Sequence, residues 1–276
     1  MRRAAIASLL LGVMISACAG PRFDLSPRFL AGEVRVYRLQ ADATVRISAG
    51  QASTSERSQL NATATIKVED LSAGVTTVTL TVTARSLRRD GKAAPVPPPQ
   101  EIRMTISPEG RVTQVTSTGS QPTSLETADV EDLVPLIGPP LPPGRVHLGD
   151  RWTQTTQPTP SGTPSPSPVA TIAARQESRL AAARVVGDYD CVVVAVSTRR
   201  PVVRERVVGG TPLRLEGLEF AASEIAFAFH EGLPITVGSD SEARLGISGG
   251  GAQGGLVVIT TKTTLTLVRR SAPGLR

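Results

Sequence analysis

The residues most open to a chemical interpretation lie near the end of the chain, where Gly246, Ser248 and Gly250 match the G-x-S-x-G pattern of a hydrolase nucleophile elbow. That pattern needs a strand before the serine and a helix after it, because the sharp turn between them exposes the hydroxyl. Here a glycine-rich stretch follows Ser248, which is a poor start for a helix, and no histidine follows to complete a triad. We therefore interpret residues 246–255 as a glycine-rich hairpin loop.

Metal binding and acid–base catalysis find equally little support. His147 and His230 are the two histidines, and neither belongs to a pair with metal-ligand spacing, so we interpret both as turn residues. Cys191 lies in a strand-like apolar stretch, where a lone cysteine behaves as a small buried side chain rather than as a nucleophile. We expect no catalysis, no metal and no other cofactor.

Cys18 is the residue for which the sequence predicts a specific chemical role. Arg2 and Arg3 give a basic start, residues 4–15 are almost wholly apolar, and the small residues Ser16 and Ala17 directly precede the cysteine. This is the layout of a secretory signal peptide. The alternatives are an uncleaved anchor and a secreted protein with a chance cysteine, but the apolar stretch is shorter than the about 20 residues of a spanning helix.

With a cysteine at the cleavage site, residues 15–18 resemble the lipobox of bacterial lipoproteins. The resemblance implies a diacylglyceryl thioether on Cys18, removal of residues 1–17, and acylation of the new amine. Ala19, where an aspartate would mark retention, implies sorting to the outer membrane in double-membraned bacteria. The expected location is the cell envelope, on the periplasmic face of the outer membrane, with the membrane contacted through the lipid on Cys18.

Composition narrows the function further. Aromatic residues make up only 3% of the chain, which argues against sugar-stacking platforms and against a nucleic-acid partner bound by base stacking. The formal charge of +6 includes Arg2 and Arg3 of the predicted signal, so the remainder is only mildly basic. No later apolar stretch is long enough to span a membrane. We expect a soluble domain held to the membrane by lipid.

Alternating apolar and polar side chains predict β-strands through most of the remaining chain. Valine and threonine dominate these stretches, and β-branched side chains suit a half-buried pleated surface. The clearest strands are expected at residues 34–39, 43–47, 60–68, 75–83, 102–106, 112–115 and 256–268. Gly110 lies where the fifth and sixth of these would form a hairpin.

One helix and one loop interrupt the strands. Thr123 and Glu126 have capping-box spacing, and apolar residues share a face through to Pro135, which predicts a helix near 124–134. Residues 157–168 are proline, serine, threonine and glycine without a large apolar side chain, and should form an exposed loop.

The second half of the chain echoes the first. Residues 185–196 resemble 71–82, and residues 225–239 resemble 104–117 with a Glu-Gly turn in each. Either an ancestral unit was duplicated, or two β-hairpins merely look alike.

The expected organisation is a signal peptide (1–17), a tether (18–30), a first β unit (31–156), a loop (157–168) and a second β unit (169–270). The fold class is mainly β and antiparallel, as a curved open sheet (half-barrel) or two duplicated β units, with one short helix.

Two further features are less specific. Gly149 to Trp152 resembles the G-D-x-W motif of uncharacterised exported bacterial β proteins; this resemblance implies no known activity, and Trp152 is expected to fill the core beneath the proline-rich residues before it. Basic residues gather at 85–92 and 199–206, as a phosphate-facing rim or as charged strand ends that discourage edge pairing.

Two functions remain. A curved sheet can hold a lipid, so the first is a lipid-anchored envelope protein that binds a lipid or another apolar ligand without catalysis. The second is a structural or assembly lipoprotein that docks onto another envelope protein through an exposed sheet edge.

Overall fold

A single antiparallel sheet contains every strand in the part of the chain that the structure describes. The computed structural model describes residues 20–72, 74–108, 110, 112–117, 141–142, 144–156, 174–208, 211–248 and 254–273. The strands are β1 (Val34–Ala49), β2 (Ala52–Ser72), β3 (Val75–Arg89), β4 (Lys92–Ala94), β5 (Gln100–Ile106), β6 (Val112–Ser117), β7 (Arg151–Thr156), β8 (Ala174–Val186), β9 (Tyr189–Val208), β10 (Thr211–Ala228), β11 (Leu233–Ser248) and β12 (Gly255–Ser271).

The first and last strands meet in the middle of this sheet. The strand order is β6-β5-β3-β2-β1-β12-β11-β10-β9-β8-β7, with β4 on the side of β3. β1 pairs with β2 on one side and with β12 on the other, so both halves of the chain are hydrogen-bonded to it. Among the described strands, β6 and β7 form the two edges and do not pair with each other, so the sheet is open.

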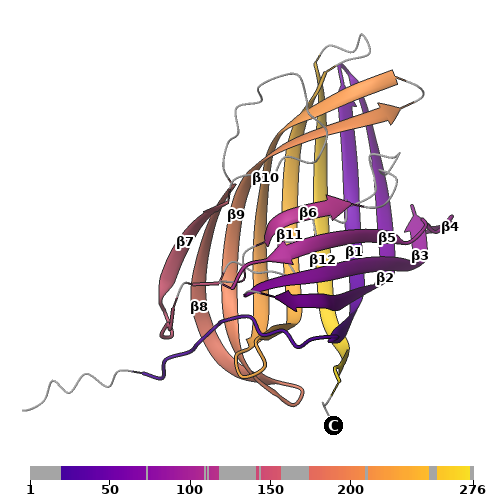
Figure 1. Cartoon of the computed structure of the whole chain (residues 1–276). Coiled ribbons are helices and arrows are strands. Elements are labelled where there is room, and N and C mark those ends of the chain that lie inside the picture. The colour runs from indigo at the N-terminus through magenta and orange to yellow at the C-terminus, as the bar shows by residue number, and fades with distance from the viewer. Residues whose placement is uncertain are drawn as a thin grey trace, which may run out of the picture.

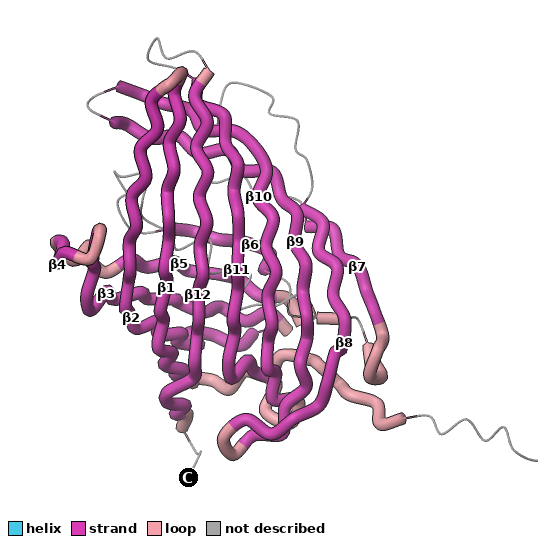
Figure 2. Tube along the Cα trace, turned by 180° about the vertical axis from the view of Figure 1, so that it is seen from behind, coloured by secondary structure: helices cyan, strands magenta, loops and turns pink. Residues whose placement is uncertain are grey.

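The sheet folds over on itself into two layers. β1, β12, β11, β10, β9 and β8 run side by side as a tall wall, and β3, β5 and β6 cross in front of it (Figures 1 and 2). β2 leads from the wall to this front layer, and its pairing with β3 shifts register at Asn61–Ala62 and at Val68–Asp70. Such β-bulges bend a strand and increase its twist, which is what this fold requires.

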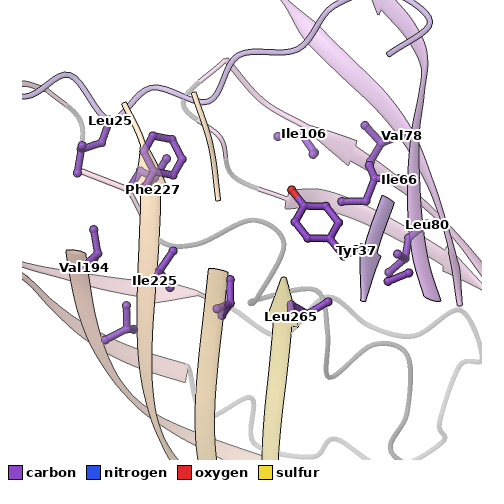
Figure 3. Close-up of a cluster of buried hydrophobic side chains, with 14 of the residues drawn as sticks. Leu25, Tyr37, Ile66, Val78, Leu80, Ile106, Val194, Ile225, Phe227 and Leu265 are labelled. Atoms are coloured by element: carbon purple, nitrogen blue, oxygen red, sulfur yellow. The ribbon is translucent and has the colours of Figure 1, made fainter. Parts of the chain in front are cut away.

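The main hydrophobic core lies between the two layers. Leu39, Val194, Ile225 and Leu265 come from the wall, and their side chains are at most 2% exposed. Ile66, Val78, Leu80, Ile102, Met104 and Ile106 come from β2 and the front layer and are equally buried. Figure 3 shows the two groups on either side of the cluster, with Leu25 of the N-terminal segment and Phe227 of β10 at its end. The part of the wall that the front layer covers is therefore packed against side chains of that layer.

The fold confirms the prediction of a mainly β, antiparallel, curved open sheet. The hairpin expected at residues 102–115 is β5–β6, with Gly110 at a φ of +79° in its turn. The described residues contain no helix, and therefore none that could cross a membrane. The helix expected near 124–134 and the loop expected at 157–168 lie outside the described residues.

Gly232, in the β10–β11 turn, allows the N-terminal segment to approach the sheet closely. Its φ is +68°, and a β-carbon there would lie 2.5 Å from Cγ and 2.6 Å from the backbone nitrogen of Arg28. Gly187, in the β8–β9 turn, has a similar φ of +60° but nothing within 4 Å of the same position.

These two glycines form a matched pair for a stability measurement. We expect Gly187→Ala to cost about 1 kcal/mol of unfolding free energy, from the left-handed backbone alone. Gly232→Ala should cost about 3 kcal/mol or more, because Arg28 must also move. Urea unfolding of the two variants checks this, and equal losses would show that the contact with Arg28 does not stabilise the fold.

Candidate functional site

The N-terminal segment closes one end of the molecule. We call this the lower end, as it stands in Figure 1; it holds the start of β1, the end of β12 and the β2–β3, β5–β6, β8–β9 and β10–β11 turns. Phe23 exchanges backbone hydrogen bonds of 2.8 and 3.0 Å with Val146, and the N–H of Arg28 donates to the carbonyl of Gly232 at 2.9 Å. Phe23 and Leu25 are buried, and the Phe23 ring packs edge-on against Phe229 at 5.2 Å. Phe23 and Leu25 thus anchor this segment in the core.

A buried carboxylate fixes the end of this segment. Glu33 is fully buried, and its oxygens accept hydrogen bonds from Arg35 at 2.9 and 3.0 Å, from Arg270 at 2.5 Å and from the N–H of Leu30 at 3.0 Å. Arg35 also donates to the carbonyl of Arg28 and lies over the ring of Phe29 at 4.7 Å. The N-terminal segment, β1 and β12 are thus held together at one carboxylate.

Burial alone would raise the pKa of Glu33, since an apolar environment disfavours its charged form. The hydrogen bonds and positive charges of Arg35 and Arg270 outweigh that effect and hold the pKa below its ordinary value. Nearby, burial raises the pKa of Tyr37 to about 12, and its hydroxyl donates to the carbonyl of Pro234 at 3.1 Å.

The inner face of the wall changes character above the core. Two successive rows of small or polar side chains cross it, one from β1 to β10 and the next from β1 to β9, and we call them the small-residue belt. Its members are Ala41, Ala43, Thr198, Ala221, Ser223, Ser239, Ser241, Thr261 and Thr263, which the strand register places side by side. Apart from the buried Thr263, all are half-buried. Ser223 donates to Ser239 at 2.9 Å.

Above the belt, the same face becomes apolar again. This upper cluster comprises the buried Val45, Val202, Leu215, Ala243, Leu245 and Val257, flanked by the half-buried Ile47, Ile247 and Ile259. All of these residues belong to the wall, whereas the main core draws on both layers. From the upper end downward, the inner face therefore carries a second buried apolar cluster, a polar belt and the main core.

Charged and polar groups lie at the β8–β9 side of the belt. Arg200 and Glu219 form an ion pair at 2.7 Å on the inner face, in the row that also holds Ala243 of the upper cluster. Ser178 of β8 is 3% exposed, and its hydroxyl has no hydrogen-bond partner in the described part of the chain. Gln176, two residues earlier on the same face, is also buried. A ligand with a polar head and an apolar tail would match this order of surfaces.

The residues singled out from the sequence do not gather into a catalytic site. Ser248 is exposed at the upper end of β11, and its hydroxyl donates to the carbonyl of Arg214 at 3.4 Å. His147 accepts from Arg22 at 3.1 Å in the turn before β7, and His230 lies in the β10–β11 turn with its carbonyl bound by Arg28 at 2.8 Å. The prediction that both histidines are turn residues is confirmed. Within the described residues, no group of three potential ligands could hold a metal ion.

Cys191 is 1% exposed and lies on the opposite face of the sheet, among Ala226, Ala228, Leu233 and Ile235. Burial raises its pKa to about 11, so the thiol is neutral and poorly reactive at neutral pH. Its interpretation as a small buried side chain is confirmed. Cys18 lies outside the described residues.

Trp152 is partly buried against the main core, as expected. The two basic groups are separate, one on β3 and one on β9, with five strands between them in the sheet. Arg85 donates to Thr63 at 2.7 Å, and Arg199 lies over the ring of Phe220 at 5.6 Å. They do not form one continuous basic surface.

Sequence reasoning missed both the Glu33 cluster and the small-residue belt. Glu33 and Arg270 are 237 residues apart, so no local pattern links them. The belt leaves a weak signal, since alanine, serine and threonine replace the large apolar residues at the inward positions of five strands.

Comparison with known proteins bears on the fold. No protein-family model and no curated protein matches the chain. Among solved structures, one on lipid–protein interactions in lipovitellin matches 90% of this chain and 26% of its own, with 13% identity and a TM-score of 0.50. The chain therefore spans about a quarter of lipovitellin.

Two further matches are an outer membrane channel from Pseudomonas putida F1 (88% of this chain, 98% of that, 10% identity, TM-score 0.33) and DynF of dynemicin biosynthesis from Micromonospora chersina (96%, 92%, 6% identity, TM-score 0.26). The likeness to lipovitellin is the one that bears on the fold.

The lowered pKa of Glu33 predicts how stability depends on pH. A carboxyl with a lowered pKa in the folded state contributes stability above its ordinary pKa of about 4.5, and that contribution is lost as the pH falls through the folded value. We expect Glu33→Gln to lower the unfolding free energy by about 3 kcal/mol at pH 7, because Arg35 is left buried without its counter-charge. The difference from the unchanged protein should shrink as the pH falls below about 4.

Glu69→Gln is the control, because its ion pair with Lys67 is largely exposed and should contribute at most about 0.5 kcal/mol. Urea unfolding across this pH range measures the unfolding free energies of both variants and of the unchanged protein. A constant difference between Glu33→Gln and the unchanged protein would contradict the assignment.

Proposed function

We propose that this protein is a lipid-anchored, non-catalytic protein of the cell envelope that holds an acyl chain or a similar apolar ligand against the inner face of its sheet. The observation that carries this proposal is the upper cluster. Its six buried members are at most 7% exposed, and the half-buried Ile47, Ile247 and Ile259 beside them keep apolar surface on the inner face above the level at which the main core ends. An apolar face on an open sheet suits a ligand whose binding is driven by removing apolar surface from water.

The polar groups beside the upper cluster support a ligand that also has a polar head. Arg200, Gln176 and Ser178 can supply a charged donor, an amide and a hydroxyl at one side of the belt. The unpartnered Ser178 hydroxyl would donate a hydrogen bond to a carboxylate or ester oxygen, and buried polar groups are stabilised by such a partner. The proposed ligand class is therefore a fatty acid or an acyl ester.

The likeness in fold to lipovitellin, whose structure concerns lipid–protein interactions, is compatible with this class of ligand. At 13% identity it supports the shape of the sheet and leaves the ligand to be tested directly.

The rival function is docking onto another envelope protein by strand addition. β6 and β7 each have one side without a partner among the described strands, and such edges accept an added strand. A substitution on the inner face separates the two functions. A larger side chain there should weaken binding of a ligand to that face, whereas it should not affect a strand added at β6 or β7.

A pair of neighbouring alanines tests the ligand site. Ala221 is half-buried on the inner face, and Ala222 is exposed on the outer face. A phenylalanine at position 221 should cover part of the inner face at the belt and weaken binding of a fluorescent fatty acid at least about tenfold, the cost of excluding roughly two methylene groups. Ala222→Phe should leave the affinity unchanged.

The same measurement contains the outcome that contradicts the proposal. If the unchanged protein, purified from membranes, carries no lipid by mass spectrometry and does not bind the fatty acid, the ligand site is refuted. If it binds but both alanine variants behave alike, the ligand does not lie on the inner face.

The anchor has a separate test. Cys18→Ser removes the thiol that a diacylglyceryl group would occupy, so incorporation of labelled palmitate in cells should be lost. Cys191→Ser is the matched control and should retain full labelling, because Cys191 is buried. Labelling that persists in Cys18→Ser would refute the lipid anchor.

A further inference from the structure

Exposed apolar side chains gather at the lower end of the molecule. Leu71 and Val75 flank the β2–β3 turn, Val185 lies at the β8–β9 turn, and Val268 is near the end of β12. Their side chains are 38–68% exposed. Leu30 and Leu148, in the N-terminal segment and the turn before β7, add two more. Six of the ten exposed large apolar residues in the described part of the chain therefore lie at this end.

Near the opposite end, the exposed large apolar residues of the described chain are Leu256 and Val203, which the strand register places in one row. The β1–β2 turn there consists of Ala49, Gly50, Gln51 and Ala52, followed by Ser53 and Thr54. Single exposed apolar residues are ordinary on protein surfaces, but several on successive turns at one end mark a contact surface.

The charges at the lower end are mixed. They include Arg22, Arg145 and Arg269 as well as Asp24, Asp70 and Asp188, so both signs are present at this end. Contact with a partner at this end would therefore depend on its apolar side chains rather than on charge.

The path of the chain limits how far this end can lie from a lipid on Cys18. Phe23 is fixed by its backbone bonds to Val146, and it lies five positions after Cys18. A fully extended chain of that length spans at most about 18 Å. An anchored Cys18 therefore keeps the lower end within roughly half a bilayer thickness of the membrane surface.

We propose that the lower end is a membrane-contact surface, whose exposed leucine and valine side chains enter the outer part of a lipid bilayer. This inference rests on the lipid anchor of the proposed function and adds an orientation to it. The wall then stands away from the membrane, with the upper cluster at its far end. Short aliphatic side chains on hairpin turns enter a bilayer without exposing unpaired backbone, because the strands behind them keep their hydrogen bonds.

Depth-dependent quenching tests the orientation. Val185→Cys and Gln51→Cys place one reactive thiol at the lower end and one at the opposite end of the full chain, while Cys191 is too buried to be labelled. Each variant is labelled with a thiol-reactive fluorophore and reconstituted through its own lipid into phosphatidylcholine vesicles containing doxyl lipids. The label at position 185 should be quenched at least about fivefold more strongly than the label at position 51. Equal quenching, or none at either position, would overturn the proposal.

Two substitutions then test the apolar contact itself. Val185→Ser combined with Val268→Ser should reduce quenching of a label at position 148 (Leu148→Cys) severalfold, since two apolar contacts with lipid are lost. Val203→Ser, a similarly exposed valine away from this end, is the control and should have no effect. Quenching that is unchanged by the double substitution, or abolished by 1 M salt, would refute an apolar contact.

The anchor and the orientation fail differently in this design. A protein that does not float with the vesicles lacks the anchor, and the proposed function fails with it. A protein that floats but shows no difference between positions 185 and 51 retains the anchor and refutes the membrane-contact surface alone.

Discussion

The carboxylate of Glu33 is the point on which the arrangement of this chain depends. It holds Arg35 of β1 and Arg270 of β12 together while it accepts the N–H of Leu30 in the N-terminal segment. Without the negative charge, two guanidinium groups would lie close together where water is largely excluded, and that is costly. The N-terminal segment therefore closes the lower end only when Leu30, Arg35 and Arg270 all reach the carboxylate of Glu33.

The inner face of the wall is divided by the small-residue belt into a lower part and an upper part. Below the belt, the front layer covers the wall and the side chains interlock as in any protein core. Above the belt, the described residues of the upper cluster all belong to the wall. Small side chains mark the boundary, because alanine and serine neither fill a core nor form an apolar surface of their own.

The local structure could be predicted from the sequence to a large extent. Alternation of valine and threonine with polar residues indicated strands in both halves, and Gly110 and Gly232 mark real turns with positive φ. The interpretations of Cys191 and both histidines also hold, since each depends on the residue's immediate neighbours. These inferences succeeded because side-chain period and turn chemistry are local properties.

The arrangement of the strands could not be predicted in this way. Residues 34–39 and 43–47 looked like two short strands because Ala41 and Ala43 interrupt the large apolar side chains, yet both belong to β1. The pairing of β1 with β12 and the ion pair between Glu33 and Arg270 join residues that are 237 positions apart. Nothing in a local window carries such information, and the register shifts that bend β2 depend on the packing of the two layers.

The meeting of β1 and β12 has a consequence for how this molecule is made. β12 follows all the other described strands in the sequence but lies at the centre of the sheet, so β1 gains its second neighbour only after the strands between them have been synthesised. Until β12 arrives, β1 presents an open hydrogen-bonding edge to any other extended chain, and the wait is long because the contact closes across almost the whole polypeptide. Loss of the final strand would not trim this sheet at its border; it would divide the sheet into two pieces.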